Sequence, residues 1–170
     1  AKEMGIYFIV FSGGEPTTYP HLLDICEKHS DVAFMMYTNG VLIDEEMAAR
    51  MAEAGNLTPA ISLEGFRERT DQRRGEGVFD KIIENMEKMK DKGIIFGASL
   101  TVNRKNISEL FKTDEFIDFL IEKGVTYVWS FHYIPIGRNP DLDLMLTPDQ
   151  RKYLAQRMPE IRSKKPIFMA

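Results

Sequence analysis

The chain has 170 residues, of which 22 are lysine or arginine and 26 are aspartate or glutamate, and its formal net charge is −4. Hydrophobic residues make up 44% and charged residues 28%, a composition that excludes intrinsic disorder and gives no reason to expect a nucleic-acid partner. The longest apolar runs, such as residues 6–11, are far shorter than the roughly 20 residues that span a bilayer. No signal-peptide pattern is present, so we expect a soluble cytoplasmic protein without a membrane partner.

Short apolar runs alternate along the chain with helical patterns. We expect strands at residues 5–11, 32–38, 59–63, 94–102 and 127–134, with a further short strand at 167–169. We expect helices at residues 21–28, 45–54, 79–92 and 115–123, and a last helix from 148 onward. Thr147, Pro148 and Gln150 form a capping box at the start of that last helix. Pro159 lies inside it and is expected to kink it, because proline lacks the backbone N–H of its turn.

The expected strands follow one another at spacings of about 26 to 35 residues, which is the repeat of a parallel β/α sheet. The strands are apolar throughout, so we expect both faces of the sheet to be covered. An eight-fold barrel needs about 250 residues, or about 31 per unit, and five or six such units fit here. The sequence therefore predicts an α/β fold, either a partial barrel or an open doubly wound sheet.

Every expected strand ends in polar or glycine-rich residues, and ligands of parallel α/β folds bind at these ends. The segments are residues 12–16 (SGGEP), 38–40 (TNG), 62–65 (SLEG), 101–103 (TVN) and 134–138 (IPIGR). In the first of them, Gly13 and Gly14 let the backbone approach a ligand, and Pro16 fixes the exit of the chain. Glu15 is an acceptor, so this loop suits an ammonium group better than a phosphate. A plain turn with a solvated glutamate is the alternative reading.

Polar side chains also alternate with apolar ones inside two of the expected strands. Ser62 lies between Ile61 and Leu63, so it points to the opposite face from them, toward the interior of a barrel. Ser99, Thr101 and His132 are further candidate residues of that interior. Other conspicuous residues have structural readings: Cys26 as a buried thiol, His132 as a core or pocket histidine, and Arg67, Arg69, Arg73 and Arg74 as parts of a charged loop.

Five segments, in order across residues 8–138, resemble motifs of the radical S-adenosylmethionine (SAM) enzymes. FSGGEP resembles the family's GGEP motif, TNG its TNG motif, and ISLEG its ISLDG motif with glutamate for the commoner aspartate. RGEGVF resembles its RG-x-G-x-F entry to a helix, and YIPIGR its segment at strand six. The resemblance implies a partial TIM-type barrel of the (β/α)6 kind, in which this chain lacks the first βα unit.

The resemblance also implies roles for particular residues. Gly13, Gly14 and Glu15, followed by Pro16, would hold the amino group of SAM, and Arg74, or its neighbour Arg73, would pair with the SAM carboxylate. Thr38, Ser62 and Glu64 would contact the ribose and methionyl parts, with Asn39 beside them. The backbone of Pro135, Ile136 and Gly137 would flank the adenine.

The family further requires a [4Fe–4S] cluster held by three cysteines spaced C-x3-C-x2-C, and Cys26 is the single cysteine. We therefore expect residues 1–170 to be one core domain of a longer chain that has lost the cysteine loop. The fragment itself would be inactive, with no catalytic or metal-binding residue of its own. The parent enzyme would cleave SAM to a 5′-deoxyadenosyl radical that abstracts hydrogen from an unknown substrate, with electrons from a donor such as flavodoxin or ferredoxin.

Two other classes of function are compatible with the residues. One is a SAM-binding or regulatory module without a cluster. The other is an unrelated β/α enzyme that uses Glu15 and Glu64 as general acid and base.

Overall fold

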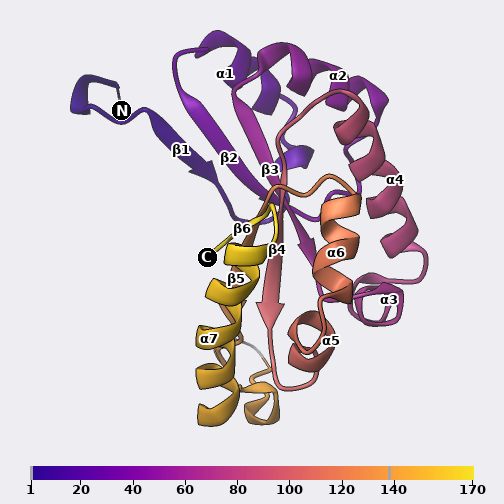
Figure 1. Cartoon of the computed structure of the whole chain (residues 1–170). Helices are drawn as coiled ribbons and strands as arrows, with labels where there is room; N and C mark the ends of the chain where they lie inside the picture. The colour runs from indigo at the N-terminus through magenta and orange to yellow at the C-terminus, as the bar shows by residue number, and fades with distance from the viewer. Residues whose placement is uncertain (1, 138) are drawn as a thin grey trace.

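The computed structural model describes residues 2–137 and 139–170, which form one sheet of six parallel strands in the order β1-β2-β3-β4-β5-β6 (Figure 1). The strands are β1 (Phe8–Phe11), β2 (Ala33–Thr38), β3 (Leu57–Leu63), β4 (Gly97–Val102), β5 (Tyr127–His132) and β6 (Phe168–Met169). Each strand pairs with the next one along the chain. A doubly wound sheet would reverse its strand order at a switch point, so this order identifies the partial barrel.

Helices connect consecutive strands, as the spacing of the strands predicts. They are α1 (Leu22–Lys28), α2 (Glu45–Ala54), α3 (Arg67–Arg74), α4 (Val78–Asp91), α5 (Ile107–Phe111), α6 (Glu115–Glu122) and α7 (Pro148–Lys164). Residues 2–137 and 139–170 also include three short 3-10 helices, η1 (Lys2–Met4), η2 (Pro16–Thr18) and η3 (Leu142–Leu144). Among the described residues, no helix has the length and apolar character needed to cross a membrane.

The prediction of a charged loop around Arg67, Arg69, Arg73 and Arg74 is wrong, because these residues form helix α3. Its sequence, RERTDQRR, contains good helix formers but buries only Thr70, so no apolar stripe marked it. The capping box at Thr147 is confirmed, and α7 runs on through Pro159 to Lys164.

The two faces of the sheet differ in burial. On β4, Ala98, Leu100 and Val102 face the helices and are fully buried, whereas Ser99 and Thr101 on the opposite face are half-buried. The core lies between this helix-covered face and the helices. We call the opposite face the concave face; it carries Phe8, Val10, Tyr37, Ser62, Ser99, Thr101, Tyr127, Trp129 and Phe131.

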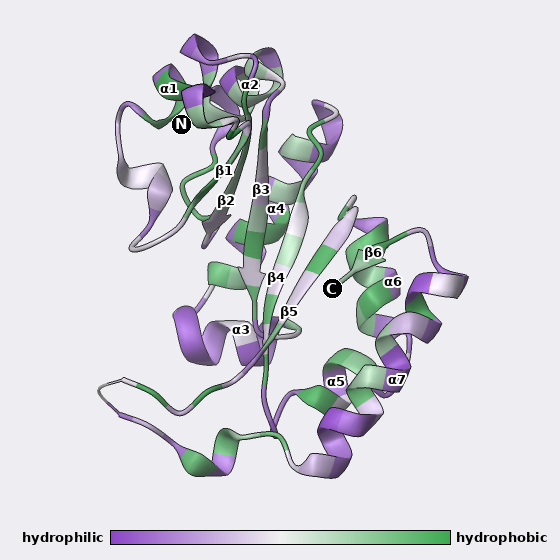
Figure 2. Cartoon of the chain, turned by 90° about the vertical axis from the view of Figure 1, so that its left-hand side faces the viewer, coloured by the Kyte–Doolittle hydropathy of each residue, from purple (hydrophilic) through white to green (hydrophobic). Residues whose placement is uncertain are grey.

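The expectation that both faces are covered is wrong for this chain. Phe8 is 55% exposed and Phe131 46% exposed, and both lie on the concave face. Figure 2 shows strands β1 to β5 from this side, with the helices of the described residues beside and behind them. The apolar runs that predicted two covered faces therefore include a face that the described residues leave accessible.

His132 does not lie on the concave face, as had been expected. It pairs in register with Val102, so it belongs to the helix side of the sheet, where it is exposed at the end of β5. The face on which His132 lies depends on the register of β5 against β4, which the local sequence does not determine. Trp129, by contrast, pairs with Ser99 and lies half-buried on the concave face.

Candidate functional site

The glycine-rich loop after β1 leaves open space above its backbone. A Cβ added to Gly13 or Gly14 would meet nothing within 4 Å in the described part of the chain. Gly13 has a φ of +108°, a conformation that L side chains rarely adopt. Pro16 then begins η2, and Glu15 caps this short helix. The loop therefore exposes backbone to a ligand, and the chain continues from it directly into η2 and then α1.

The Glu15 carboxylate is held by four hydrogen bonds. Its Oε1 accepts from Thr17 N (3.1 Å), Thr17 Oγ1 (2.7 Å) and Thr38 Oγ1 (2.6 Å), and its Oε2 accepts from Asn39 N (2.7 Å). Partial burial favours a raised pKa, but the hydrogen bonds from Asn39, Thr38 and Thr17 together outweigh it, and the pKa of Glu15 is lowered. Glu15 is thus an ionised acceptor fixed between the ends of β1 and β2.

Thr38 supports Glu15 and does not face the ligand space that was expected for it. Its hydroxyl donates to Glu15 and accepts from Gly40 N at 3.1 Å, and the residue is buried on the helix side of β2. The Asn39 side chain accepts from Val41 N at 2.9 Å, so it shapes the turn after β2. Both residues fix the position of Glu15, Thr38 through its hydroxyl and Asn39 through its backbone N–H.

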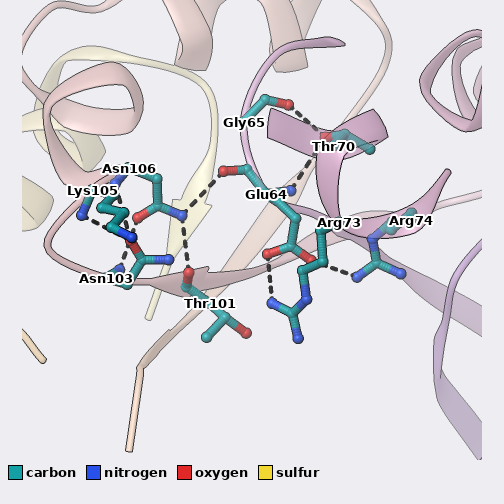
Figure 3. Close-up of polar contacts among 9 residues, drawn as sticks. All are labelled: Glu64, Gly65, Thr70, Arg73, Arg74, Thr101, Asn103, Lys105 and Asn106. Atoms are coloured by element: carbon teal, nitrogen blue, oxygen red, sulfur yellow. Dashed lines mark hydrogen bonds and ion pairs between the residues drawn. The ribbon is translucent and has the colours of Figure 1, made fainter. Parts of the chain in front are cut away.

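Glu64, at the end of β3, is buried and anchors two arginines (Figure 3). Its Oε1 accepts from Arg74 Nη2 at 2.7 Å, and its Oε2 accepts from Arg73 Nη1 at 2.8 Å. The expected contact of Glu64 with ribose is therefore not the arrangement that the structure favours, because both carboxylate oxygens already accept from guanidinium groups. Each arginine keeps other N–H donors for a ligand.

The two arginines differ in their surroundings. The Arg73 side chain is 58% exposed, whereas that of Arg74 is 21% exposed. Arg74 Nε is buried and has no hydrogen-bond partner within residues 2–137 and 139–170. A buried donor without a partner is costly, and a carboxylate ligand would satisfy it. This orphaned atom fits the assignment of Arg74, at the end of α3, to the carboxylate of SAM.

Asn106, the N-cap residue of α5, supports the same site and was not among the residues predicted from the sequence. Its Nδ2 donates to the backbone oxygens of Glu64 and Thr101, both at 3.0 Å, and its Oδ1 accepts from Asn103 N at 2.7 Å. These bonds join the ends of β3 and β4. A pair of asparagines directly after a strand is a turn signal that could have drawn attention to it.

Glu109 on α5 fixes the start of α3. Its Oε1 accepts from Phe66 N, and its Oε2 accepts from Arg69 Nε, both at 2.7 Å. Thr70 adds a bond from its hydroxyl to the backbone oxygen of Gly65 at 3.0 Å. The helix that carries Arg73 and Arg74 is therefore tied to the end of β3 and to α5.

The remaining expected residues are less closely joined. Ser62 pairs in register with Ser99, and both are half-buried on the concave face. Pro135, Ile136 and Gly137 follow β5, and no hydrogen bond among the described residues joins them to Glu15, Glu64 or Arg74. Arg138, the last residue of the matched IPIGR segment, lies outside the described residues.

An iron–sulfur cluster does not fit the residues described. Cys26 lies fully buried in α1, and burial raises the pKa of its thiol to about 11. No group of three or more His, Cys, Asp or Glu side chains in the described structure could hold a metal ion. The thiolates that a [4Fe–4S] cluster needs are thus not supplied by this site.

The fold and the site together define a partial β/α barrel whose strand ends present an ionised carboxylate and a guanidinium pair. The sequence model of the Radical SAM superfamily matches residues 1–117, and the chain belongs to this family. Enzymes of the family use SAM and a [4Fe–4S] cluster.

Curated relatives support the membership. The chain is 32% identical over 150 residues to an Fe-coproporphyrin III synthase of Methanosarcina barkeri. The alignment covers 84% of this chain and 37% of the relative. It is 32% identical over 160 residues to the mycofactocin maturase MftC of Mycolicibacterium smegmatis, covering 90% of this chain and 40% of the relative. The chain therefore spans well under half the length of these two relatives.

Solved structures share the fold. The structure of Streptococcus suis SuiB bound to S-adenosylmethionine superposes with a TM-score of 0.77 at 19% identity, covering 96% of this chain and 39% of that one. A domain of pyruvate-formate lyase-activating enzyme from Bacteroides vulgatus covers 95% of this chain and 96% of that one, with a TM-score of 0.62 at 12% identity. These similarities confirm the partial barrel.

Proposed function

We propose that this chain is the SAM-binding core of a radical SAM enzyme. The observation that carries the proposal is a matched pair of groups at the strand ends: the ionised Glu15 beside the open glycine loop, and the buried, unpartnered Nε of Arg74. The first suits the ammonium group of SAM and the second its carboxylate.

The residues of this chain bind and orient the cofactor. Glu15 and the backbone oxygens of Gly13 and Gly14 accept from the ammonium group, and Arg74 donates to the carboxylate from a position fixed by Glu64. Ser62, on the concave face of β3, contacts the ribose or methionyl part of SAM, and the backbone of residues 135–137 flanks the adenine. Bound SAM would supply the chemistry of this family, hydrogen abstraction from a substrate, once one electron from the cluster of the longer protein cleaves it to methionine and a 5′-deoxyadenosyl radical.

We further propose that residues 1–170 are one domain of a longer protein and that the cluster cysteines lie outside it. The single cysteine and the coverage of under half of the two relatives support this. An in-frame C-x3-C-x2-C upstream in the gene, and thiolate–iron absorbance after iron reconstitution of that longer protein, would agree with it. A stop codon directly upstream would contradict it and favour a cluster-less SAM-binding module.

Calorimetry with SAM on the 170-residue chain tests the binding proposal. Glu15→Gln keeps the shape of the side chain and removes its charge, and Arg74→Lys keeps a charge and removes the planar fork. Each should weaken SAM binding by about tenfold or more, because each removes a charge-assisted contact. Arg50→Lys, on α2 and paired with Asp24 and Glu27, is the control and should leave the affinity unchanged. Absence of binding at millimolar SAM, or equal affinity in all four proteins, would overturn the proposal.

A further inference from the structure

A cavity of about 450 Å³ lies beside the Glu64 anchor, and its lining is rich in hydrogen-bond donors. Arg69, Arg73 and Lys105 supply three cationic groups, and Asn103 and Tyr133 supply polar ones. Glu64 is the one carboxylate of the lining. The volume is within the range of small-molecule sites, which is about 300–1,000 Å³.

The charge of this cavity is positive although the chain is acidic. Its lining carries the cations Arg69, Arg73 and Lys105 against the carboxylate of Glu64. Two charged groups outside the lining cancel each other: Glu109, which pairs with Arg69, and Arg74, which pairs with Glu64. Two positive charges are therefore left in excess, in a chain whose net charge is −4. A cavity of this sign attracts an anion and disfavours a cation.

The donors of the cavity are available, while the carboxylate of its lining is occupied. Glu64 already accepts from Arg73 and Arg74 through both oxygens. Arg73 uses Nη1 for that bond and is otherwise exposed, and the Lys105 ammonium makes no hydrogen bond or ion pair within the described residues. Tyr133 accepts from Asp141 N at 3.1 Å, which leaves its own O–H to donate.

The cavity is distinct from the position that Arg74 offers to SAM. Arg73 lines it and Arg74 does not, and the two guanidinium groups bind different oxygens of Glu64. Glu64 therefore lies between the two arginines, with Arg73 on the side of the cavity and Arg74 on the side proposed for SAM.

We propose that Arg73 and Lys105 form a subsite for an anionic group, a carboxylate or phosphate, carried by the second substrate. This inference rests on the proposed SAM-binding function, since it assigns the cavity next to SAM to the molecule that reacts with it. An exposed arginine and lysine without a ligand are the alternative, and the SAM carboxylate is the other possible source of the anion.

Titration of the 170-residue chain with inorganic phosphate and pyrophosphate, at low ionic strength and with saturating SAM, tests the subsite. The variant Arg73→Gln/Lys105→Glu should bind both anions about tenfold more weakly than the wild type. Lys105→Glu alone, at an exposed residue, should show a smaller loss in the same direction and should keep the SAM affinity of the wild type. Lys152→Glu, on the exposed side of α7, makes the same charge change away from the cavity and should bind like the wild type. Thermal unfolding of each variant checks that it is folded.

Two results would overturn the subsite: anion affinity that is equal in the wild type and the double variant, or no anion binding at all. If Lys105→Glu loses SAM and phosphate affinity together, the cavity holds the SAM carboxylate and the assignment to a second substrate is wrong. Anion binding that depends on Arg73 and Lys105, in a chain that fails to bind SAM without phosphate present, would refute the proposed function while the anion site stands. The two failures are therefore distinguishable.

Discussion

The ring of Tyr127 lies directly over Gly97, its partner in the neighbouring strand: a Cβ added to Gly97 would stand 2.2 Å from the ring carbon Cε2. In this position the Tyr127 hydroxyl reaches across β4 to Thr58 Oγ1 (2.9 Å) and to the backbone oxygen of Pro59 (3.1 Å) on β3. Because Gly97 has no side chain, Tyr127 of β5 can cross β4 and form hydrogen bonds with β3.

Gly97→Ala should lower the free energy of unfolding by about 1–3 kcal/mol, because the added methyl must displace the ring or the strand. Urea unfolding measures the loss. In a Tyr127→Ala background the same substitution should cost much less, since the clash is gone. A loss of equal size in both backgrounds would show that the contact is not its cause.

Burial raises the pKa of Tyr127 to about 12, although its bond to Thr58 acts in the opposite direction. The folded state therefore prefers the neutral phenol, and this contribution to stability is complete below pH 10 and lost as the pH rises toward 12. Tyr127→Phe should flatten the alkaline decline in stability, by no more than about 3 kcal/mol. In a pH titration followed by phenolate absorbance, the variant should have one tyrosine fewer that ionises at the highest pH. An unchanged titration curve would contradict the raised pKa of Tyr127.

The contribution of Glu15 to stability should depend on pH in the opposite sense, with its loss at low pH. Burial is outweighed by the hydrogen bonds from Asn39, Thr38 and Thr17, so its pKa lies below the ordinary 4.5. Its contribution to stability is present above that ordinary value and is lost as the pH falls through the lowered pKa. Glu15→Gln should be less stable at pH 7 and should lose less on acidification. Glu53→Gln, on the exposed side of α2, is the control, and identical acid profiles for the wild type and Glu15→Gln would refute the prediction.

Gly65 is expected to tolerate no side chain. A Cβ there would lie 2.1 Å from Glu109 Oε1, at a φ of +148°. Gly65→Ala should cost about 2–4 kcal/mol from the clash and the backbone strain together. Gly75→Ala, at a φ of +116° and with its nearest contact an ordinary 3.7 Å to Val78 Cγ2, has backbone strain without a clash and should cost less. Equal losses at the two positions would mean that Glu109 yields freely.

Asn106→Ala should also destabilise the protein, by about 1–3 kcal/mol for each backbone group that loses its buried partner. The groups concerned are the oxygens of Glu64 and Thr101 and the N–H of Asn103. Because Glu64 anchors Arg74, SAM affinity should fall as well. Asn139→Ala, at an exposed position, is the control for calorimetry and unfolding, and a stable variant with normal SAM affinity would remove Asn106 from the site.

Much of the fold could be predicted because local signals carried it. Apolar runs marked the strands, and Asp44 and Gly55 marked the two ends of α2. Helix α3 could not be found this way, since it buries a single threonine and is held by Glu109 from a distant helix. The face of the sheet on which His132 lies could not be predicted from nearby residues either, because it depends on the register between β4 and β5.

The site divides in the same manner. The loop at Glu15 and the arginine at the end of α3 stand next to recognisable sequence motifs, so they could be proposed from the chain alone. The partners that hold them could not: Glu15 meets Thr38 and Asn39 from 23 and 24 residues away, and Asn106 meets Glu64 across 42. Such contacts exist only once the strands are in place.

Trp129 is the single tryptophan of the chain, and it lies half-buried on the accessible concave face. Its indole emission therefore comes from one place, beside Ser99 in the middle of the sheet. Any molecule or chain segment that covers this face will change the polarity around that ring. The protein thus carries an intrinsic fluorescent reporter of the occupancy of its own barrel, which can be followed without a label.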